Sequence, residues 1–321
     1  MFKEAIDLVN NSNTIYVVGH QGPDGDAIGS SFAVCLAMRK IGKKANVIMP
    51  KCSESFKFLP GIDSAVECVK EPEYDLLIAV DCSDKARLAI LPEDYNKAKK
   101  VLMIDHHEKG NVYGDVQVIE STMPAACQIT FDFLTALNIE IDKDIATYLY
   151  TGLMTDTGSF NYATTRPSTL IAAAKLIEKG IDFSGICQKL NHTIKEGKLR
   201  LISKTIDNME VYFDGKLRYA YIDYETVKKL GLDDEESEGM TNYLKMVENT
   251  EVAAYVRQRE DGSNKVSLRS NGNVDVSKIA LMFDGGGHKR AAGYTMIDAL
   301  DVEKEKLLNV VGEMLNDNTS K

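Results

Sequence analysis

The stretch His20-Gln21-Gly22-Pro23-Asp24-Gly25-Asp26 decides the fold, because it joins a short apolar run at residues 15–18 to the start of a helical segment. An apolar run of this length is typical of a buried strand. One histidine and two aspartates therefore lie in a loop at the carboxyl end of a strand, where open α/β sheets bind their ligands. An imidazole and two carboxylates so close together suit a divalent cation. The alternative is a polar turn in which Asp26 caps the helix.

Three further segments end in residues that can bind a metal ion. Apolar runs lead to Asp81 and to Asp105-His106-His107, and a helical run ends near Asp156. One such aspartate is usually a helix cap or a solvated turn. Four segments with the same kind of ending are hard to explain in that way, so the sequence predicts a metal site.

The candidate ligands are numerous enough for two ions. They are His20, Asp24, Asp26, Asp81, Asp156 and one histidine of the pair His106-His107. A carboxylate shared by two ions about 4 Å apart suits an in-line phosphoryl displacement. Ligation by histidine and aspartate favours Mn²⁺, with Mg²⁺ or Co²⁺ as alternatives. Successive side chains of an extended chain point to opposite faces. We therefore expect one histidine of the pair to bind metal and the other to face substrate or structure, with Asp105 supporting the ligands through hydrogen bonds.

These motifs resemble those of the DHH phosphoesterases. The resemblance rests on His20-x-x-x-Asp24-x-Asp26, Asp81 in Val-Asp-Cys-Ser-Asp, Asp105-His106-His107, and Asp156 in Gly-Leu-Met-Thr-Asp-Thr-Gly. A fifth segment, Gly285-Gly286-Gly287-His288-Lys-Arg290-Ala-Ala-Gly293, resembles the signature of the DHH-associated C-terminal domain. The resemblance covers nearly the whole chain and is closest to the nano-RNases that also act as pAp phosphatases.

The resemblance implies a role for each residue. One ion would be bound by His20, Asp24 and Asp81, and the other by Asp26, Asp81, His106 and Asp156. His107 would contact the substrate phosphate, so catalysis is assigned to Asp81, Asp105 and His107. The implied substrates are RNA of a few nucleotides, cut to mononucleotides, and 3′-phosphoadenosine 5′-phosphate (pAp), cut to AMP.

Two other functions remain open. The main alternative is a phosphodiesterase for linear or cyclic dinucleotides such as pApA and cyclic di-AMP. The other is a non-catalytic nucleotide sensor, which would normally have lost a metal ligand, and no ligand is missing here.

Composition limits the partners and the location. The 321 residues carry a net charge of -10 and have a pI near 5.1. An acidic chain lacks the extended basic face that tracks along long nucleic acid, so we expect small or very short substrates. The six cysteines show no CxxC spacing and indicate a reducing compartment. No apolar run approaches the roughly 20 residues of a membrane span. We predict a cytoplasmic enzyme with no membrane partner, and a homodimer is compatible with the sequence.

The chain is organised as two lobes. Alternating strand and helix signals in residues 1–185 predict an α/β domain with a mostly parallel sheet and helices on both faces. The expected strands are 14–19, 45–49, 75–81, 100–105 and 116–120, and the expected helices are 26–41, 124–137, 143–156 and 167–180. Residues 183–209 are predicted to be helical throughout, with 186–210 as a linker. Residues 211–321 are predicted to form a smaller α/β lobe with two hairpins and helices near 276–283 and 301–316.

The second lobe is expected to bind the substrate. The consecutive glycines Gly285, Gly286 and Gly287 let backbone N–H groups form a concave turn for phosphate, although such runs also occur in plain loops. His288 ends this turn and is expected to belong to the same anion pocket. Arginine offers a planar fork for phosphate, so we expect Arg290, Arg257 and Arg269 to complete the pocket. Arg87, in the loop after Asp81, has two equally supported roles, at the metal site or on the surface.

Overall fold

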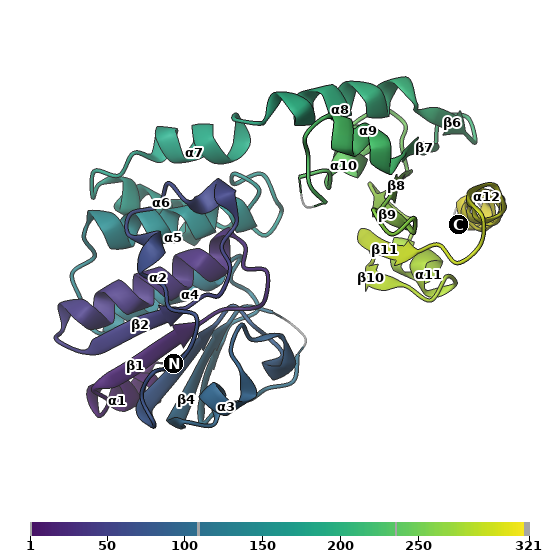
Figure 1. The fold of residues 1–321 in the computed structure, drawn as a ribbon. Helices are drawn as coiled ribbons and strands as arrows, with labels where there is room; N and C mark the ends of the chain where they lie inside the picture. The colour runs from purple at the N-terminus through teal and green to yellow at the C-terminus, as the bar shows by residue number, and fades with distance from the viewer. Residues whose placement is uncertain (1, 108–109, 235, 318–321) are drawn as a thin grey trace. The chain divides into compact units, whose positions relative to one another are not determined.

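The computed structural model describes residues 2–107, 110–234 and 236–317. The chain divides into two compact units, residues 1–193 and 194–321, each with its own sheet (Figure 1). The division after Thr193 lies within the stretch that the sequence assigns to a linker. Among the described residues, no helix combines the length and apolar character needed to cross a membrane.

The first unit contains a five-stranded sheet with the order β2-β1-β3-β4-β5. Its strands are β1 Thr14–Val18, β2 Lys44–Ile48, β3 Tyr74–Val80, β4 Ala98–Asp105 and β5 Val116–Ile119. All four strand pairs are parallel. The strands are rich in buried apolar residues, as expected of parallel strands covered on both faces. The strand order reverses between β1 and β3, and ligands bind such sheets at the carboxyl ends next to this reversal.

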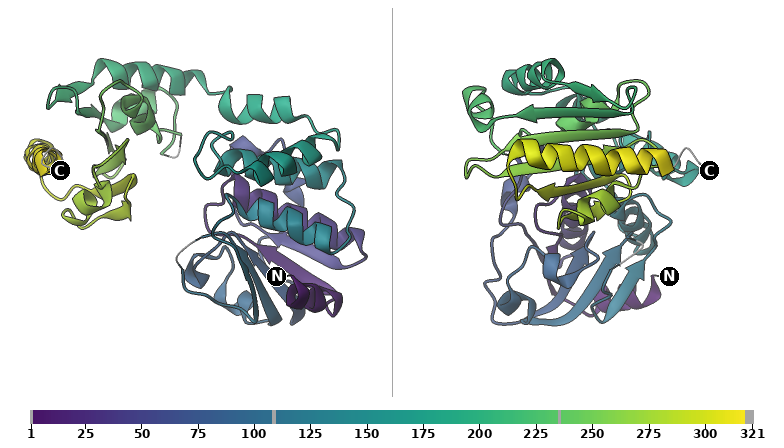
Figure 2. Two further views of the ribbon diagram at one scale, coloured as in Figure 1. Left: turned by 180° about the vertical axis from the view of Figure 1, so that it is seen from behind. Right: turned by 90° about the vertical axis from the view of Figure 1, so that its right-hand side faces the viewer.

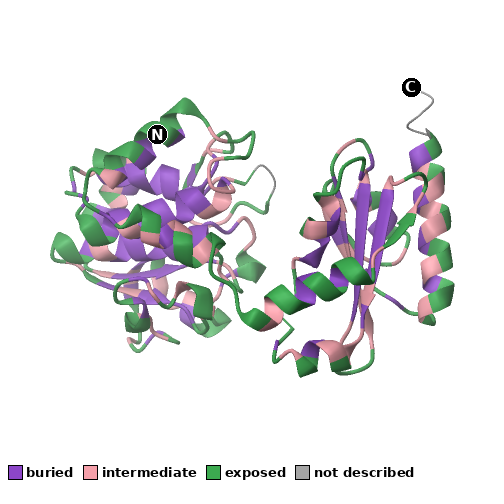
Figure 3. Cartoon of the chain, turned by 90° about the horizontal axis from the view of Figure 1, so that it is seen from above, coloured by how far each residue is buried: buried purple, intermediate pink, exposed green. Residues whose placement is uncertain are grey.

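Long helices cover one face of this sheet. A single core joins the strands to α1 Lys3–Asn10, α2 Gly25–Lys40, α4 Ala126–Ala136 and α5 Lys143–Asp156. Beyond them lie α6 Pro167–Ile177 and α7 Phe183–Asn191. A second core on the opposite face includes Tyr16 and Leu77 and is covered by α3 Pro92–Tyr95 and neighbouring loops. The prediction of an α/β fold with a parallel sheet is confirmed, and each face of the sheet carries a core of buried residues. Figure 3 shows the buried residues in purple.

Helices α2 and α5 pack closely because glycines line their contact. A Cβ atom at Gly25 would lie 2.3 Å from Thr155 Oγ1, and one at Gly29 would lie 2.5 Å from the Tyr148 carbonyl oxygen. Only hydrogen fits at these positions, so the two helices approach each other along this line. The amino end of α2 therefore lies beside the carboxyl end of α5.

The second unit contains a six-stranded mixed sheet with the order β10-β11-β9-β8-β7-β6. Its strands are β6 Glu210–Tyr212, β7 Leu217–Ile222, β8 Val252–Gln258, β9 Asn264–Ser270, β10 Gly286–His288 and β11 Ala291–Thr295. Strands β7 and β8 are parallel and the other pairs are antiparallel. One face is covered by α8 Glu196–Asp207, α9 Tyr224–Lys229 and α10 Met240–Lys245. The other is covered by α11 Val276–Leu281 and α12 Leu300–Asp317 (Figure 2).

Two predictions about local structure are wrong. The stretch 183–209 is not continuously helical, because α7 ends at Asn191 and α8 begins at Glu196. The predicted glycine turn is instead an edge strand, β10, in which Gly286 pairs with Gly293 and His288 with Ala291. Gly285 and Gly287 allow this pairing, since a Cβ would lie 2.4 Å from the Gly293 carbonyl oxygen at the first and 2.5 Å from the Ala291 carbonyl oxygen at the second.

Candidate metal centre

The six predicted metal ligands converge at the carboxyl edge of the first sheet. His20 follows β1, Asp81 follows β3, His106 follows β4, Asp24 and Asp26 begin α2, and Asp156 ends α5. In the part of the chain that the structure describes, three groups of side chains lie close enough to hold an ion. Two of these groups are His20–Asp24–Asp81 and Asp26–His106–Asp156.

The first group is built around His20. Its Nε2 lies 3.8 Å from Asp24 Oδ1 and 3.7 Å from Asp81 Oδ2. Its Nδ1 lies 3.0 Å from the Gln21 carbonyl oxygen. A hydrogen bond from Nδ1–H to this carbonyl fixes the tautomer and directs the Nε2 lone pair toward the carboxylates.

The second group is built around His106. Its Nε2 lies 3.8 Å from Asp26 Oδ2 and 3.5 Å from Asp156 Oδ2. Its Nδ1 lies 3.3 Å from the Met123 carbonyl oxygen, which holds the ring in the orientation that a metal ligand needs.

Asp26 is held by the amino end of α4. Its side chain is fully buried, and its two oxygens accept hydrogen bonds from the amides of Ala126 (2.5 Å) and Cys127 (2.9 Å). The positive end of a helix stabilises a carboxylate there. Gly152 of α5 lies behind it, and a Cβ at this position would be 2.2 Å from Cys127 Sγ and 2.8 Å from Asp26 Oδ1.

Asp81 belongs to the first group and also faces the second. Its Oδ2 faces His20, and its Oδ1 lies 3.4 Å from His106 Nε2. The residue is 3% exposed, and Oδ1 is buried without a hydrogen-bond partner. A buried carboxylate oxygen without a partner is costly unless a cation compensates it. The donor set therefore fits a carboxylate placed between two divalent ions.

Burial and neighbouring charges shift the pKa values of the site residues. Burial and the neighbouring charge of Asp26 raise the pKa of Asp81 to about 8 and that of Asp156 to about 7. Burial alone would lower the pKa of His106, but the carboxylate of Asp81, 3.4 Å from its Nε2, and the charge of Asp26 raise it to about 10. These carboxylates resist ionisation because they are crowded and buried, and a bound cation favours their ionised form.

His107 is held differently from its neighbour. Its Nδ1 lies 2.8 Å from Asp105 Oδ1, and this hydrogen bond raises the pKa of His107. Asp105 is fully buried, whereas the His107 side chain is 42% exposed. The third possible ion-binding group contains Asp81, His106 and His107. Because Asp105 engages Nδ1 of His107, the arrangement favours a role for the free Nε2 toward a substrate.

Arg87 lies in the loop after Asp81. Its carbonyl oxygen accepts a hydrogen bond from the Gln21 amide at 2.7 Å, which ties this loop to the one that carries His20. The Arg87 side chain is exposed. The structure therefore places its backbone beside the metal-binding loop and leaves its side chain in solvent.

Arg269 and His288 lie on one row of the second sheet. Arg269 of β9 pairs with Ala291 of β11, which pairs with His288 of β10. Paired residues of neighbouring strands share a face of the sheet, so both side chains project from the same face across a small residue. Arg290 is exposed in the two-residue turn between β10 and β11.

Arg257 does not fit the predicted anion pocket. Its side chain is 4% exposed, and Nη1 donates to the carbonyl oxygen (2.7 Å) and Oδ1 (2.9 Å) of Asp234 and to Ser237 Oγ. The guanidinium group thus holds this loop against β8 and is not free for phosphate. The prediction fails here because the sequence shows a strand arginine but not the loop that folds over it.

Two family models match large parts of the chain. Residues 14–153 match the DHH family, N-terminal domain, and residues 214–317 match the DHHA1 domain. The bifunctional oligoribonuclease and PAP phosphatase NrnA of Thermus thermophilus is 32% identical over 304 residues, covering 94% of this chain and 90% of that protein. The cyclic-di-AMP phosphodiesterase PdeA of Listeria monocytogenes is 26% identical over 333 residues, covering 94% of this chain but 48% of PdeA. The crystal structure of an exopolyphosphatase-related protein from Bacteroides fragilis superposes with a TM-score of 0.88 at 26% identity, covering 98% of this chain and 95% of that one.

Proposed function

This chain belongs to the DHH family, and we propose that it is a metal-dependent phosphoesterase that degrades very short RNA to mononucleotides and dephosphorylates pAp to AMP. The observation that carries the proposal is the buried Asp81 carboxylate, which faces one ligand group with each of its oxygens. The substrates are those in the name of the Thermus thermophilus relative, which is similar over nearly its whole length.

The ligand assignment is part of the proposal. His20, Asp24 and Asp81 would hold one divalent ion, and Asp26, Asp81, His106 and Asp156 would hold the other. Mn²⁺ is the favoured ion because the ligands mix imidazole with carboxylates. When bound, such ions activate water and stabilise the charge that develops on a phosphate. His107, oriented by Asp105, would donate a hydrogen bond from Nε2 to the phosphate, the geometry of a general acid.

A phosphodiesterase for linear or cyclic dinucleotides is the second candidate. It is favoured by the similarity to the Listeria protein, whose name states that activity. Because the chain spans about half of that protein's length, this candidate ranks below the first. Both candidates need the same metal centre, so only the substrates distinguish them.

A substrate panel tests the function. Turnover with Mn²⁺ should be measured on pAp, pApA, cyclic di-AMP and 5′-labelled RNA of two to twenty nucleotides. We expect the highest kcat/KM for pAp and the shortest RNA, because an acidic chain does not attract long polyanions. Exhaustive chelation should abolish turnover. A rate that rises steadily with RNA length would point to a processive exonuclease, and full turnover in chelator would exclude metal dependence.

We further propose that Arg269 and strand β10 hold a second anionic group of the substrate. Arg269→Ala should raise KM for pAp and dinucleotides because it removes a charge-assisted contact. The expected loss in kcat/KM is about 30- to 150-fold, or roughly 2–3 kcal/mol. Hydrolysis of bis-p-nitrophenyl phosphate, which lacks a second anionic group, should barely change.

The matched control is Arg259→Ala, which removes the same charge from the turn at the opposite end of the β8–β9 hairpin. It should leave both substrates unaffected. Mn²⁺ affinity, followed by calorimetry, should be the same in both variants. Equal losses of Arg269→Ala on pAp and on the synthetic diester would mean that this arginine serves the chemistry or the fold.

A further inference from the structure

An open pocket of about 300 Å³ lies beside the metal-binding loop of the first unit. Its lining includes Gln21 and Pro23, which stand between the candidate ligands His20 and Asp24 in the sequence. Other parts of the wall come from Pro50, after β2, and from Ala89, Ile90 and Leu91, before α3. The pocket thus shares a loop with one ligand group but contains none of its ligands.

The walls of this pocket are held in place by backbone hydrogen bonds. The Gln21 amide donates to the Arg87 carbonyl oxygen at 2.7 Å, and the Ala89 amide donates to the Gly19 carbonyl oxygen at 3.0 Å. The Met49 amide, beside Pro50, donates to the Val66 carbonyl oxygen at 3.0 Å. Pockets for small molecules are usually preformed in this way.

The lining suits a flat, uncharged ring. Most of it is apolar. Leu91 is 53% exposed, and covering its apolar surface with a ligand would be favourable. Lys51 and Glu67, the charged residues of the lining, carry opposite charges, so the pocket does not attract phosphate by net charge. The side-chain amide of Gln21 adds an uncharged polar group to the lining, and apolar walls with a few polar groups are typical of sites for organic ligands.

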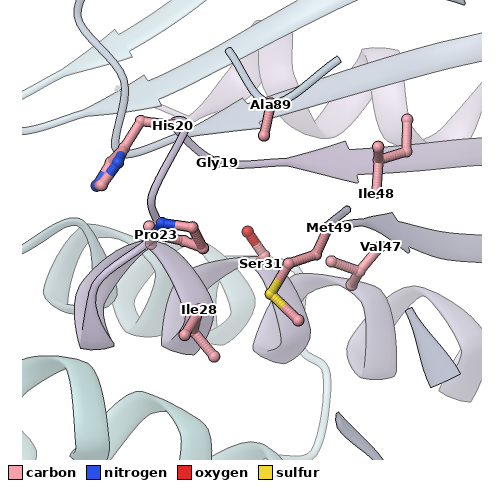
Figure 4. Close-up of a pocket in the computed structure, with 10 residues that line it drawn as sticks. Gly19, His20, Pro23, Ile28, Ser31, Val47, Ile48, Met49 and Ala89 are labelled. Carbon is pink, nitrogen blue, oxygen red and sulfur yellow. The ribbon is translucent and has the colours of Figure 1, made fainter. Parts of the chain in front are cut away.

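A second, smaller cavity shares part of this lining and includes a candidate metal ligand. This cavity, of about 10 Å³, shares Pro23 and Ala89 with the large pocket, and His20 is among its other lining residues (Figure 4). A group in the large pocket would therefore lie next to the loop that presents His20.

We propose that this pocket binds a nucleobase of the substrate. The phosphate attached to that nucleoside would be the one bound at His20, Asp24 and Asp81, so the proposal rests on the proposed function. Apolar contact with a base is tolerant of sequence, because every base has a flat aromatic face. The pocket would thus favour nucleotides over other phosphate esters without selecting one base.

The test compares Leu91→Ser with Leu170→Ser. Leu170 lies on α6 of the same unit and is 51% exposed, so the control makes the same change at the same exposure. Each variant is assayed on a dinucleotide and on its analogues in which one base is replaced by hydrogen. In Leu91→Ser, the ratio of kcat/KM for the dinucleotide to that for one abasic analogue should fall about tenfold, as expected for a lost apolar contact. In Leu170→Ser the ratio should equal that of the wild type.

Two results would overturn the proposal. An unchanged ratio in Leu91→Ser would mean that no base occupies the pocket. Equal losses on the dinucleotide and on both abasic analogues would mean that Leu91 acts through the His20 loop. Binding of 2-aminopurine riboside 5′-monophosphate, followed by its fluorescence, gives a readout without turnover and should weaken in Leu91→Ser only. If the wild type binds this probe but hydrolyses no nucleotide, the proposed function fails and the pocket stands.

Discussion

Replacing Asp81 by asparagine should lower kcat on pAp by at least about 100-fold while leaving the fold intact. Asp81 contacts both ligand groups, one with each carboxylate oxygen, so the change weakens two ion sites at once. Asparagine has the same shape and tolerates the left-handed backbone of this position, where φ is 50°. Circular dichroism checks the fold, and steady-state kinetics with Mn²⁺ measures the loss. A variant that keeps more than about a tenth of the wild-type rate would contradict the shared-carboxylate assignment.

The same variant has a second expected property in chelator. Burial raises the pKa of Asp81 to about 8 in the folded, metal-free protein, whereas an unfolded aspartate releases its proton near pH 4. Between these values the folded state binds the additional proton, so this group makes the metal-free wild type less stable as the pH rises from about 4 to about 8. Asparagine does not titrate. The melting temperature of Asp81→Asn relative to wild type should therefore rise across this window. With Mn²⁺ added, the wild type should have the higher melting temperature, because the ions stabilise the wild type more than Asp81→Asn.

The convergence of the ligands could be predicted because of one rule about parallel sheets. The carboxyl ends of β1, β3 and β4 lie at the same edge, so residues that follow these strands meet there whatever their separation in sequence. The rule needs only the strand ends, and apolar runs mark those ends clearly. The rule does not predict which groups hold each ligand in place. Asp26 accepts hydrogen bonds from the backbone amides of Ala126 and Cys127, and no sequence pattern marks backbone amides for such a role.

The second unit was harder to predict because its elements depend on tertiary contacts. Strand β10 consists of Gly286, Gly287 and His288, and glycine has a low strand propensity. Only its pairing with β11 makes this segment a strand. Helices α9 and α10 have six residues each, too few for a helical period to show in the sequence. Local composition therefore indicated a loop where long-range pairing produced regular structure.

Gly152→Ala should damage both stability and activity, although alanine is the better helix former by about 1 kcal/mol. A Cβ at this position would lie 2.2 Å from Cys127 Sγ and 2.8 Å from Asp26 Oδ1, and the surroundings are fully buried. Overpacking of this kind costs about 1–3 kcal/mol. Displacement of Asp26 by about 1 Å should reduce kcat about 100-fold. Thermal unfolding and turnover with Mn²⁺ measure the two effects.

Gly312→Ala is the matched control for Gly152→Ala. Gly312 lies inside α12, where the nearest atoms to an added Cβ are ring atoms of Phe213 at 3.0 Å, and that ring is 40% exposed and can move. This variant should be as stable as the wild type or more so, and fully active. Adding Cys127→Ala to Gly152→Ala removes the sulfur contact but not the contact with Asp26. The double variant should therefore recover stability while its kcat stays low. If Gly152→Ala behaves like Gly312→Ala, the close approach of α5 is not what positions Asp26.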